Sequence, residues 1–541
     1  MSIHRGSDGP GRVAVPRRAA RSPIPYATPE VAWTAGAVFL VGLAIYLRTM
    51  LPGTSFWDTG EAQTVPPTLS IFHPTGFPTY TLVGWLWSRL PIGEVAWRMN
   101  LLSGVSVAGA AALAVLVVGQ LAEARHRVTV AAAAGIGGLA FAFASEPWRN
   151  AVRADVHALH ILLAACVVWL LVSWASARAA GARRADGWLL GAAFTFGVSM
   201  SNHPLTGLMA FGIAAWLFIV DPRIWRRWKL ILACALLLAL GLALYSYILI
   251  RAWIPPEPPL FYARPTTLER FRYLVFAEQF RDLFRPFDAP LADFGFKWAD
   301  AERVLERQFI GPGWLIAGVG AAVLAARRLG AFVFLGLLVA GNLVYAMNFR
   351  DGDIDRYYML TAWIGAVGIG VAVSGIGAAA GRALADATRR SLGIVGRRRA
   401  AVLGVALVVL LAAGLPLGGL VTLYRERDRH ADHDAERWVA AVHQILPADA
   451  VIISWWSYST PLWYHRWIEG ERPDVKIIDE RNVLDDGYGT IGNAVETFLG
   501  RRPVYIVPPS WEMDAILASW EIETIQTYPG YTELWRVVGR R

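Results

Sequence analysis

Two carboxylates, Asp58 and Glu61, lie three residues apart just after the first long apolar segment of the chain. A carboxylate held beside a substrate can accept the proton of an attacking hydroxyl, and a second acid can orient the acceptor or raise the pKa of the first. Their spacing does not choose between them, but Asp58 is nearer the apolar segment and directly follows Trp57. We therefore predict general-base catalysis, with Asp58 as the base and Glu61 as its companion.

The Asp-x-x-Glu spacing has a second interpretation. It is also the capping-box pattern, in which polar side chains bond the first backbone N–H groups of a helix. The two interpretations are compatible, because a helix that begins at a cleft can hold both roles.

Several polar residues stand next to apolar segments, where a polar group without a partner is costly. His73 opens a Pro-rich stretch, and it is either incidental to a kinked connection or hydrogen-bonds a phosphate or sugar oxygen. Asn202 and His203 form a corner between two apolar runs. His157 and His160 lie on one helix face by their spacing, but a metal site needs more ligands than this pair.

Arginines at the ends of apolar segments also have two interpretations. Arg251 ends one such segment, and Arg356 closes a short loop that also contains Asp353 and Asp355. An arginine at this depth is either a snorkelling anchor or a ligand for the phosphate of a lipid-linked donor. The planar guanidinium suits the second role because it can form two parallel hydrogen bonds to a phosphate.

The composition indicates a polytopic α-helical membrane protein. Of 541 residues, 55% are hydrophobic and 17% charged, and apolar runs long enough to cross a bilayer recur along most of the chain. The arginines behind the net charge of +9 cluster in short loops, a distribution that marks the cytoplasmic side of a membrane protein. We therefore expect no nucleic-acid partner. Cys166 and Cys234 lie inside apolar runs, so we expect both to be core residues that form no disulfide. About eleven spans are expected, at 31–49, 100–122, 128–145, 156–176, 187–202, 204–220, 230–250, 311–326, 329–348, 358–380 and 401–424.

The arginine distribution predicts the orientation of these spans. Arginine-rich short loops lie on the side of the N-terminal tail, 1–28, which we expect to be disordered and cytoplasmic. The loops 50–99 and 251–310, and the chain after about 425, lie on the other side and hold nearly all the acids and histidines. We therefore expect extracytoplasmic chemistry. The Arg- and Ala-rich composition favours a bacterial inner (plasma) membrane.

The chain divides into three expected parts, a tail at 1–28, a transmembrane domain at 29–424 and a soluble α/β domain at 425–541. Within the second part, helical spacing at 268–284 predicts an amphipathic helix on the membrane surface. In the third part, short β-branched runs alternate with helical patterns, which predicts a small, mostly parallel α/β domain without a nucleotide motif. The helices expected there are 435–445, 461–468, 492–499 and 511–520.

Six blocks of the chain resemble the protein O-mannosyltransferase-like membrane family, which is similar to the GT-C glycosyltransferase superfamily. They are FWDTGEAQTVPPTLSIFHPTGFPTYTLVGWL, RADVHALHILL, FGVSMSNHPLTGL, YSYILIRAWIPPEPPL, NFRDGDIDRYYMLTAW and PLWYHRWIEGERPDVKIID. They cover most of the chain in the family's order, and the first, D-x-G-E followed by H-P-x-G-x-P-x-Y, is the most specific. Thr59 and Thr75 depart from the family's D-S-G-E and H-P-P-G, which bears on the identity of the substrate.

The resemblance implies a multi-span enzyme that uses a polyprenyl-phosphate sugar and carries a catalytic acid in its first extracytoplasmic loop. Asp58 matches that acid, and Glu61 matches its companion. The residues expected to bind the donor or its phosphate are His73, Asn202, His203, Arg251 and Arg356. Those expected to contact the acceptor or the sugar are Trp57, Tyr80, His157 and Asp353. We expect no cofactor and no metal, although Asp353 or Asp355 could hold one.

We therefore expect a membrane glycosyltransferase that passes a sugar from a polyprenyl-phosphate donor to a protein hydroxyl and inverts the anomeric centre. Mannose is the first candidate for the sugar. Transfer to a lipid or cell-envelope glycan is the alternative among enzymes. A transporter of lipid-linked glycans would have polar residues near the bilayer midplane and inverted repeats, which the sequence does not display. A non-catalytic scaffold would make Asp58 and Glu61 dispensable.

Overall fold

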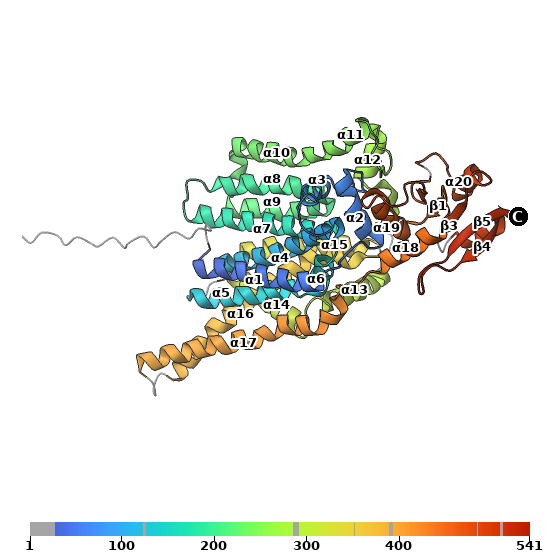
Figure 1. Cartoon of the computed structure of the whole chain (residues 1–541). Helices are drawn as coiled ribbons and strands as arrows, with labels where there is room; N and C mark the ends of the chain where they lie inside the picture. The colour runs from blue at the N-terminus through green and yellow to red at the C-terminus, as the bar shows by residue number, and fades with distance from the viewer. Residues whose placement is uncertain are drawn as a thin grey trace, which may run out of the picture.

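The computed structural model describes residues 27–122, 126–284, 291–350, 352–388, 393–483, 485–508 and 512–541. A bundle of long helices forms one end of the molecule, and a small α/β domain forms the other (Figure 1). The expected tail lies outside the described residues apart from its last two positions. The first residue of the expected helix at 511–520 lies outside them as well.

Each of the eleven expected spans coincides with a helix. These helices are α1 (Pro29–Thr49), α4 (Val95–Leu121), α5 (Arg127–Ala142), α7 (Val156–Ala179), α8 (Asp186–Asn202), α9 (Ala210–Val220), α10 (Trp228–Leu242), α14 (Gly313–Arg327), α15 (Leu329–Asn348), α16 (Met359–Ala387) and α17 (Ile394–Arg427). Among the described residues, seven helices are long and apolar enough to cross a membrane. They are eight if α5 and α6 (Ser145–Ala151), which are bent by 67°, form one span. The predicted helical membrane class is confirmed, and the number of spans stays a prediction.

Small residues let the central helices approach closely. A Cβ added at Gly137 of α5 would lie 2.6 Å from the carbonyl oxygen of Ala366 in α16, and one at Gly320 of α14 would lie 1.9 Å from that of Gly368. Close backbone contact of this kind supplies the packing attraction that apolar helices need in a membrane. These contacts place α16 at the centre of the bundle.

Two extended connections lie at the end of the bundle that faces the α/β domain. The first contains α2 (Trp57–Thr68) and α3 (Pro78–Trp87), and the second contains α11 (Ser246–Trp253), α12 (Leu268–Val275), the short helix η4 (Glu278–Leu283) and α13 (Leu291–Glu306). The amphipathic helix expected at 268–284 is thus broken in two, at Ala277, whose φ of 49° is left-handed. The connections join where the Ile71 N–H donates to the Leu260 carbonyl at 2.9 Å.

The α/β domain contains four helices and one sheet. The helices α18 (Asp434–Ile445), α19 (Trp456–Trp467), α20 (Ile491–Phe498) and α21 (Met513–Ser519) lie at or near the expected positions. The strands are β1 (Val451–Ser454), β2 (Lys476–Asp479), β3 (Val504–Val507), β4 (Trp520–Ile525) and β5 (Leu534–Arg540), in the order β2-β1-β3-β5-β4.

The prediction of a mostly parallel sheet was wrong for half of this sheet. β1 pairs in parallel with β2 and β3, but β5 pairs antiparallel with β3 and β4. The reason is that β4, which the sequence did not predict, reaches β5 through a short connection, and a short connection joins antiparallel strands only.

Asp479 at the end of β2 predicts a pH-dependent stability. Burial, helped by Glu480, raises the pKa of its carboxyl from 3.8 to about 8. The folded protein therefore binds an extra proton between these values, and the stability due to the neutral carboxyl is full at low pH and lost as the pH rises to about 8. We expect the free energy of unfolding to fall by up to about 1.4 kcal/mol per pH unit from this group.

Thermal unfolding of the detergent-purified protein between about pH 5 and pH 8 tests this expectation. Asp479→Asn keeps a neutral side chain at every pH, so its unfolding free energy should fall less steeply than that of the wild type. Identical slopes for the two proteins would contradict the assignment.

Candidate active site

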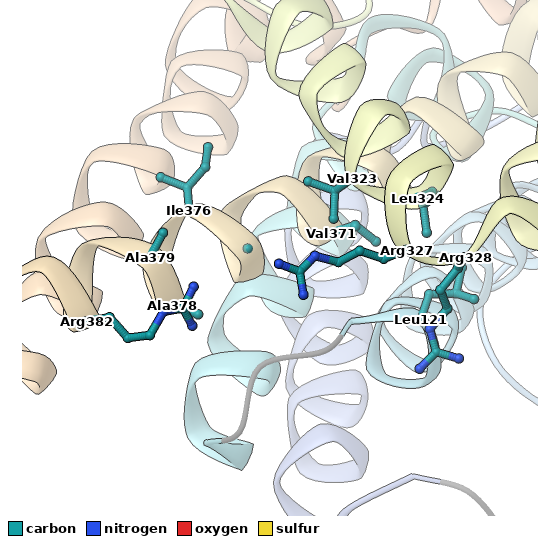
Figure 2. A pocket seen from close by; sticks show the side chains of 11 residues that line it. Leu121, Val323, Leu324, Arg327, Arg328, Val371, Ile376, Ala378, Ala379 and Arg382 are labelled. Atoms are coloured by element: carbon teal, nitrogen blue, oxygen red, sulfur yellow. The ribbon is translucent and has the colours of Figure 1, made fainter.

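Two cavities are candidates for the active site. The smaller, about 270 Å³, lies among α4, α14 and α16, and Figure 2 shows Arg327, Arg328 and Arg382 around its apolar side chains. No acid or imidazole among the described residues lines it, so it contains no candidate base. The larger, about 840 Å³, is lined by the two long connections, the bundle and the α/β domain. Because it combines acids, imidazoles and arginines, the larger cavity is the candidate active site.

The larger cavity brings together most of the residues that the sequence singled out. The predicted site residues that line it are Trp57, Asp58, His73, His157, His203, Asp353 and Arg356. Those that do not line it are Glu61, Tyr80, Asn202 and Arg251. The sequence analysis missed Arg149, Arg153, Tyr357, Trp456 and Arg481, which also line it. The available signal for the first two was their spacing of four residues in a short connection between two apolar segments.

Asp58 lies on the cavity wall in the first turn of α2, with 34% of its side chain exposed. Its Oδ2 accepts a hydrogen bond from Arg356 Nη2 at 2.9 Å, and its Oδ1 accepts one from Trp456 Nε1 at 3.2 Å. Burial would raise the pKa of Asp58, but the charges of Arg356 and His73 outweigh burial and hold that pKa well below its usual range. The carboxylate is therefore ionised at neutral pH and can accept a proton.

The capping-box interpretation of Asp58 and Glu61 was wrong. Phe56 is the N-cap residue of α2, and no side chain caps this helix. Both carboxylates bond to residues outside α2 instead. Trp57 is 52% exposed and packs edge-on against Trp455, with ring centroids 5.1 Å apart, so one face of its indole can still meet a ligand.

Glu61 is buried behind His73 and does not reach the cavity. It accepts a hydrogen bond from the His73 backbone N–H at 2.9 Å and a short one from the imidazole Nδ1. Burial raises the pKa of Glu61. Burial alone would lower the pKa of His73, but the charge and hydrogen bond of Glu61, together with the charge of Asp58, raise it. Glu61 therefore holds the His73 ring on the cavity wall, and it can act on a substrate only through that ring.

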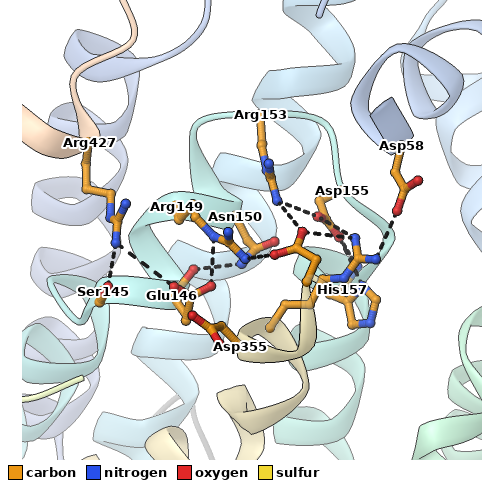
Figure 3. Close-up of polar contacts among 12 residues, drawn as sticks. Asp58, Ser145, Glu146, Arg149, Asn150, Arg153, Asp155, His157, Asp355 and Arg427 are labelled. Carbon is orange, nitrogen blue, oxygen red and sulfur yellow. Dashed lines mark hydrogen bonds and ion pairs between the residues drawn. The ribbon is translucent and has the colours of Figure 1, made fainter. Parts of the chain in front are cut away.

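A network of arginines and acids extends from Asp58 toward α17 (Figure 3). Arg356 Nη1 lies 3.6 Å from Asp155 and 3.7 Å from Asp353. Arg153 lies 3.1 Å from Asp353, and Arg149 bonds Asp353 as well. The members are the arginines Arg149, Arg153, Arg356 and Arg427 and the acids Asp58, Glu146, Asp155 and Asp353. Arg427 also pairs with the exposed Glu426 at 3.0 Å, so among the described residues the acids of this network are at least as many as its arginines.

His157 and His203 form a second polar wall of the cavity, with ring centroids 4.6 Å apart. His157 Nδ1 lies 3.1 Å from Asp155, and His203 Nδ1 accepts the Leu205 N–H at 3.2 Å. The other ring nitrogen of His157 is buried without a hydrogen-bond partner among the described residues. A buried polar atom of this kind would be satisfied by a polar ligand.

Three predicted residues lie away from the cavity wall, in contact with other parts of the protein. Arg251 donates to the carbonyls of Leu69 and Pro256, both at 2.8 Å, and so ties the two long connections together. Asn202 donates to the Val156 carbonyl at 3.1 Å, and Tyr80 is fully buried. The sequence could not separate these roles, because a phosphate ligand and a backbone clamp at the membrane surface need the same guanidinium.

Asp58, Glu61 and His73 are also the one group of potential metal ligands among the described residues, with ligand atoms within 4.8 Å of one another. Two carboxylates and an imidazole suit a divalent transition metal. A cation would compete with existing bonds here, because Glu61 and His73 bond each other and Arg356 bonds Asp58. The donor set fits a metal, and the hydrogen bonds show that the residues are also satisfied without one.

Solved structures show which fold this cavity belongs to. The chain is similar to ArnT from Cupriavidus metallidurans, with a TM-score of 0.57 and 14% identity over 94% of this chain and 98% of that one. A second ArnT structure, bound to undecaprenyl phosphate, gives 0.55. The Archaeoglobus fulgidus oligosaccharyltransferase, tethered to an acceptor peptide, gives 0.51 with 12% identity over 94% of this chain and 74% of that one. The chain has the fold of the GT-C glycosyltransferases.

Sequence relatives narrow this class. Residues 58–228 match the family described as "Protein O-mannosyl-transferase TMEM260 N-terminal domain". The mouse protein O-mannosyl-transferase TMEM260 is 26% identical over 474 residues, 84% of this chain and 63% of the mouse protein. The Dictyostelium discoideum protein of the same name is 22% identical over 196 residues, 34% of this chain and 23% of its own. The chain is therefore similar to the protein O-mannosyl-transferase TMEM260 proteins, in agreement with the resemblance seen in its motifs, and it spans about 63% of the mouse relative.

Proposed function

We propose that this protein is a membrane glycosyltransferase that passes a sugar from a polyprenyl-phosphate donor to a hydroxyl acceptor on the extracytoplasmic face. The observation that carries the proposal is an ionised carboxylate, Asp58, on the wall of a large cavity, hydrogen-bonded to Arg356 and close to further arginines. A base and guanidinium groups in one cavity are the two parts that transfer from a phosphate leaving group needs.

In the proposed step, the acceptor oxygen attacks C1 of the sugar and bonds to it while the bond from C1 to the phosphate oxygen breaks. The hydroxyl proton goes to Asp58, and the lipid phosphate leaves with the bonding electrons. A single displacement inverts the anomeric centre. Asp58 is a weak base because of its low pKa, so it takes the proton once the acceptor oxygen has begun to bond and has become acidic.

The other site residues have supporting roles in this proposal. Arg356, with Arg149 and Arg153 beside it, stabilises negative charge as it develops on the leaving phosphate. His73, oriented by Glu61, donates a hydrogen bond to a hydroxyl or phosphate oxygen of the donor. His157 does the same through its Nε2, which has no hydrogen-bond partner among the described residues. Asp353 orients Arg149 and Arg153, which is a different role from the predicted contact with the acceptor.

The donor and acceptor classes rest on the relatives. One ArnT structure holds undecaprenyl phosphate, the oligosaccharyltransferase structure holds an acceptor peptide, and the sequence relatives are named as protein O-mannosyl-transferases. We therefore propose mannose on a polyprenyl phosphate as donor and a protein hydroxyl as acceptor, with a lipid or cell-envelope glycan as the second candidate acceptor. The proposed location is a bacterial inner membrane, with a cytoplasmic N-terminus and an extracytoplasmic α/β domain.

The test is transfer of labelled mannose from synthetic polyprenyl-phosphate mannose to peptide and to glycan acceptors by the purified chain. Label on a peptide hydroxyl supports the proposal, and label on a glycan alone moves it to the second acceptor. If no donor of several sugar types is consumed, but the lipid is moved across a vesicle membrane, the protein is a transporter and the proposal fails.

Metal removal should leave this transfer unchanged. Glu61, His73 and Asp58 already bond other side chains, so the proposed step uses no cation at their positions. The measurement is the initial rate before and after dialysis against a chelator, with magnesium, manganese and zinc added back separately. A loss of more than about tenfold that one metal restores would reassign these three residues as metal ligands.

A further inference from the structure

Two residues of the α/β domain, Trp456 and Arg481, line the cavity, and the proposed mechanism gives neither of them a role. Trp456 is the second residue after β1, and Arg481 is the second residue after β2, its parallel neighbour. Residues that follow parallel strands meet at one edge of the sheet, which is where open α/β sheets bind ligands. That edge lies against the cavity here, because both side chains line it.

Trp456 connects this edge to the proposed base. Its indole N–H donates to Asp58, and its ring packs edge-on against His73, with centroids 5.3 Å apart. The ring is 1% exposed, so its position is set by packing on all sides. The α/β domain is thus in direct contact with the Asp58 carboxylate and the His73 imidazole of the first connection.

Arg481 rests on this tryptophan. Its guanidinium carbon lies 4.5 Å from the centre of the Trp456 ring, a cation–π distance. Its backbone N–H donates to Asp479 Oδ1 at 3.0 Å, which shapes the turn after β2. The side chain remains 34% exposed, so the guanidinium is held in place and is still open to a ligand.

The charge around Arg481 differs from that around the other cavity arginines. Arg149, Arg153 and Arg356 belong to a network in which the described acids are at least as many as the arginines, so that network brings no excess positive charge. Arg481 has Glu480 at 3.8 Å, which is longer than a hydrogen bond. A ligand that carries a negative charge gains more from a cation that is weakly compensated.

We propose that Arg481 binds the phosphate of the lipid-linked donor, so that the α/β domain supplies part of the donor site. This inference rests on the proposed function, which makes a lipid phosphate the anion in this cavity. Arg481 is a binding residue in this account, and the arginine network near Asp58 acts on the same phosphate when it leaves.

The test is binding of undecaprenyl phosphate to the purified full chain in detergent, beside undecaprenol, which has the same tail without the charge. Arg481→Ala should weaken binding of the phosphate by about tenfold to a hundredfold and leave undecaprenol binding unchanged. Arg481→Lys keeps the charge but not the planar fork of the guanidinium, so its affinity for undecaprenyl phosphate should lie between those of the wild type and Arg481→Ala. Arg536→Ala on β5, an exposed arginine of the same domain paired with Glu523, is the matched control.

The outcomes separate this inference from the proposed function. If Arg481→Ala binds undecaprenyl phosphate as the wild type does, or loses both lipids equally, the inference is overturned even where sugar transfer is observed. If binding of the phosphate depends on Arg481 but no donor sugar is ever transferred, the inference stands and the proposed function fails. If the wild type does not distinguish the phosphate from the alcohol, both fail.

Discussion

Asp58→Asn is expected to lower the rate of sugar transfer by about 10²- to 10⁴-fold, the usual contribution of a general base. The amide oxygen of Asn can still accept the Trp456 N–H, and Arg356 keeps Asp155 and Asp353 as partners, so the fold should survive. What is lost is the acceptor for the hydroxyl proton. The measurement is the rate of label transfer from polyprenyl-phosphate mannose, with thermal unfolding as the check on folding.

Glu61→Gln is the matched comparison for this prediction. Glu61 does not line the cavity and acts through His73, so its loss should cost less than the loss of Asp58. If Glu61→Gln abolishes transfer while Asp58→Asn stays active, the base is the His73 imidazole oriented by Glu61, and the roles of the two acids are exchanged. If both variants transfer sugar at the wild-type rate, neither acid is needed and the scaffold interpretation gains support.

The fold was largely readable from local patterns. Apolar length placed a helix at every expected span, and alternating apolar runs placed three parallel strands, because both signals come from neighbouring residues. The strand β4 was not predicted because it starts directly where α21 ends, without a turn residue between them. The break of the predicted amphipathic helix at Ala277 was not predicted for a similar reason, because alanine is not a residue type that indicates a left-handed conformation.

The site was readable only in part, because its decisive contacts join residues far apart in the chain. The Asp58–Arg356 pair spans 298 positions, and the Asp58–Trp456 bond spans 398. The sequence pointed to Asp58 and to Arg356 separately, but no sequence pattern indicates that the two side chains bond each other. Trp456 belongs to a different domain, and its approach to Asp58 depends on how that domain docks. Arg251 was predicted by the same reasoning as Arg356, and only packing separates the phosphate candidate from the backbone clamp.

Arg356 is the residue whose replacement should affect both activity and stability most. Its side chain is 9% exposed and lies among three carboxylates, Asp58, Asp155 and Asp353. Arg356→Ala leaves these acids without a shared partner, and we expect it to destabilise the protein by about 3–5 kcal/mol. Arg356→Lys keeps the charge but loses the fork that reaches several oxygens at once.

The lysine variant therefore separates the two roles of Arg356. We expect it to fold, because one cation still compensates the buried acids, yet to transfer sugar about 10²- to 10³-fold more slowly, because it cannot bond Asp58 and stabilise the leaving phosphate together. Arg251→Lys is the control, since Arg251 bonds backbone carbonyls away from the cavity and its replacement should change the rate little. Full activity in Arg356→Lys would show that a point charge suffices and that the guanidinium geometry at Asp58 plays no part in transfer.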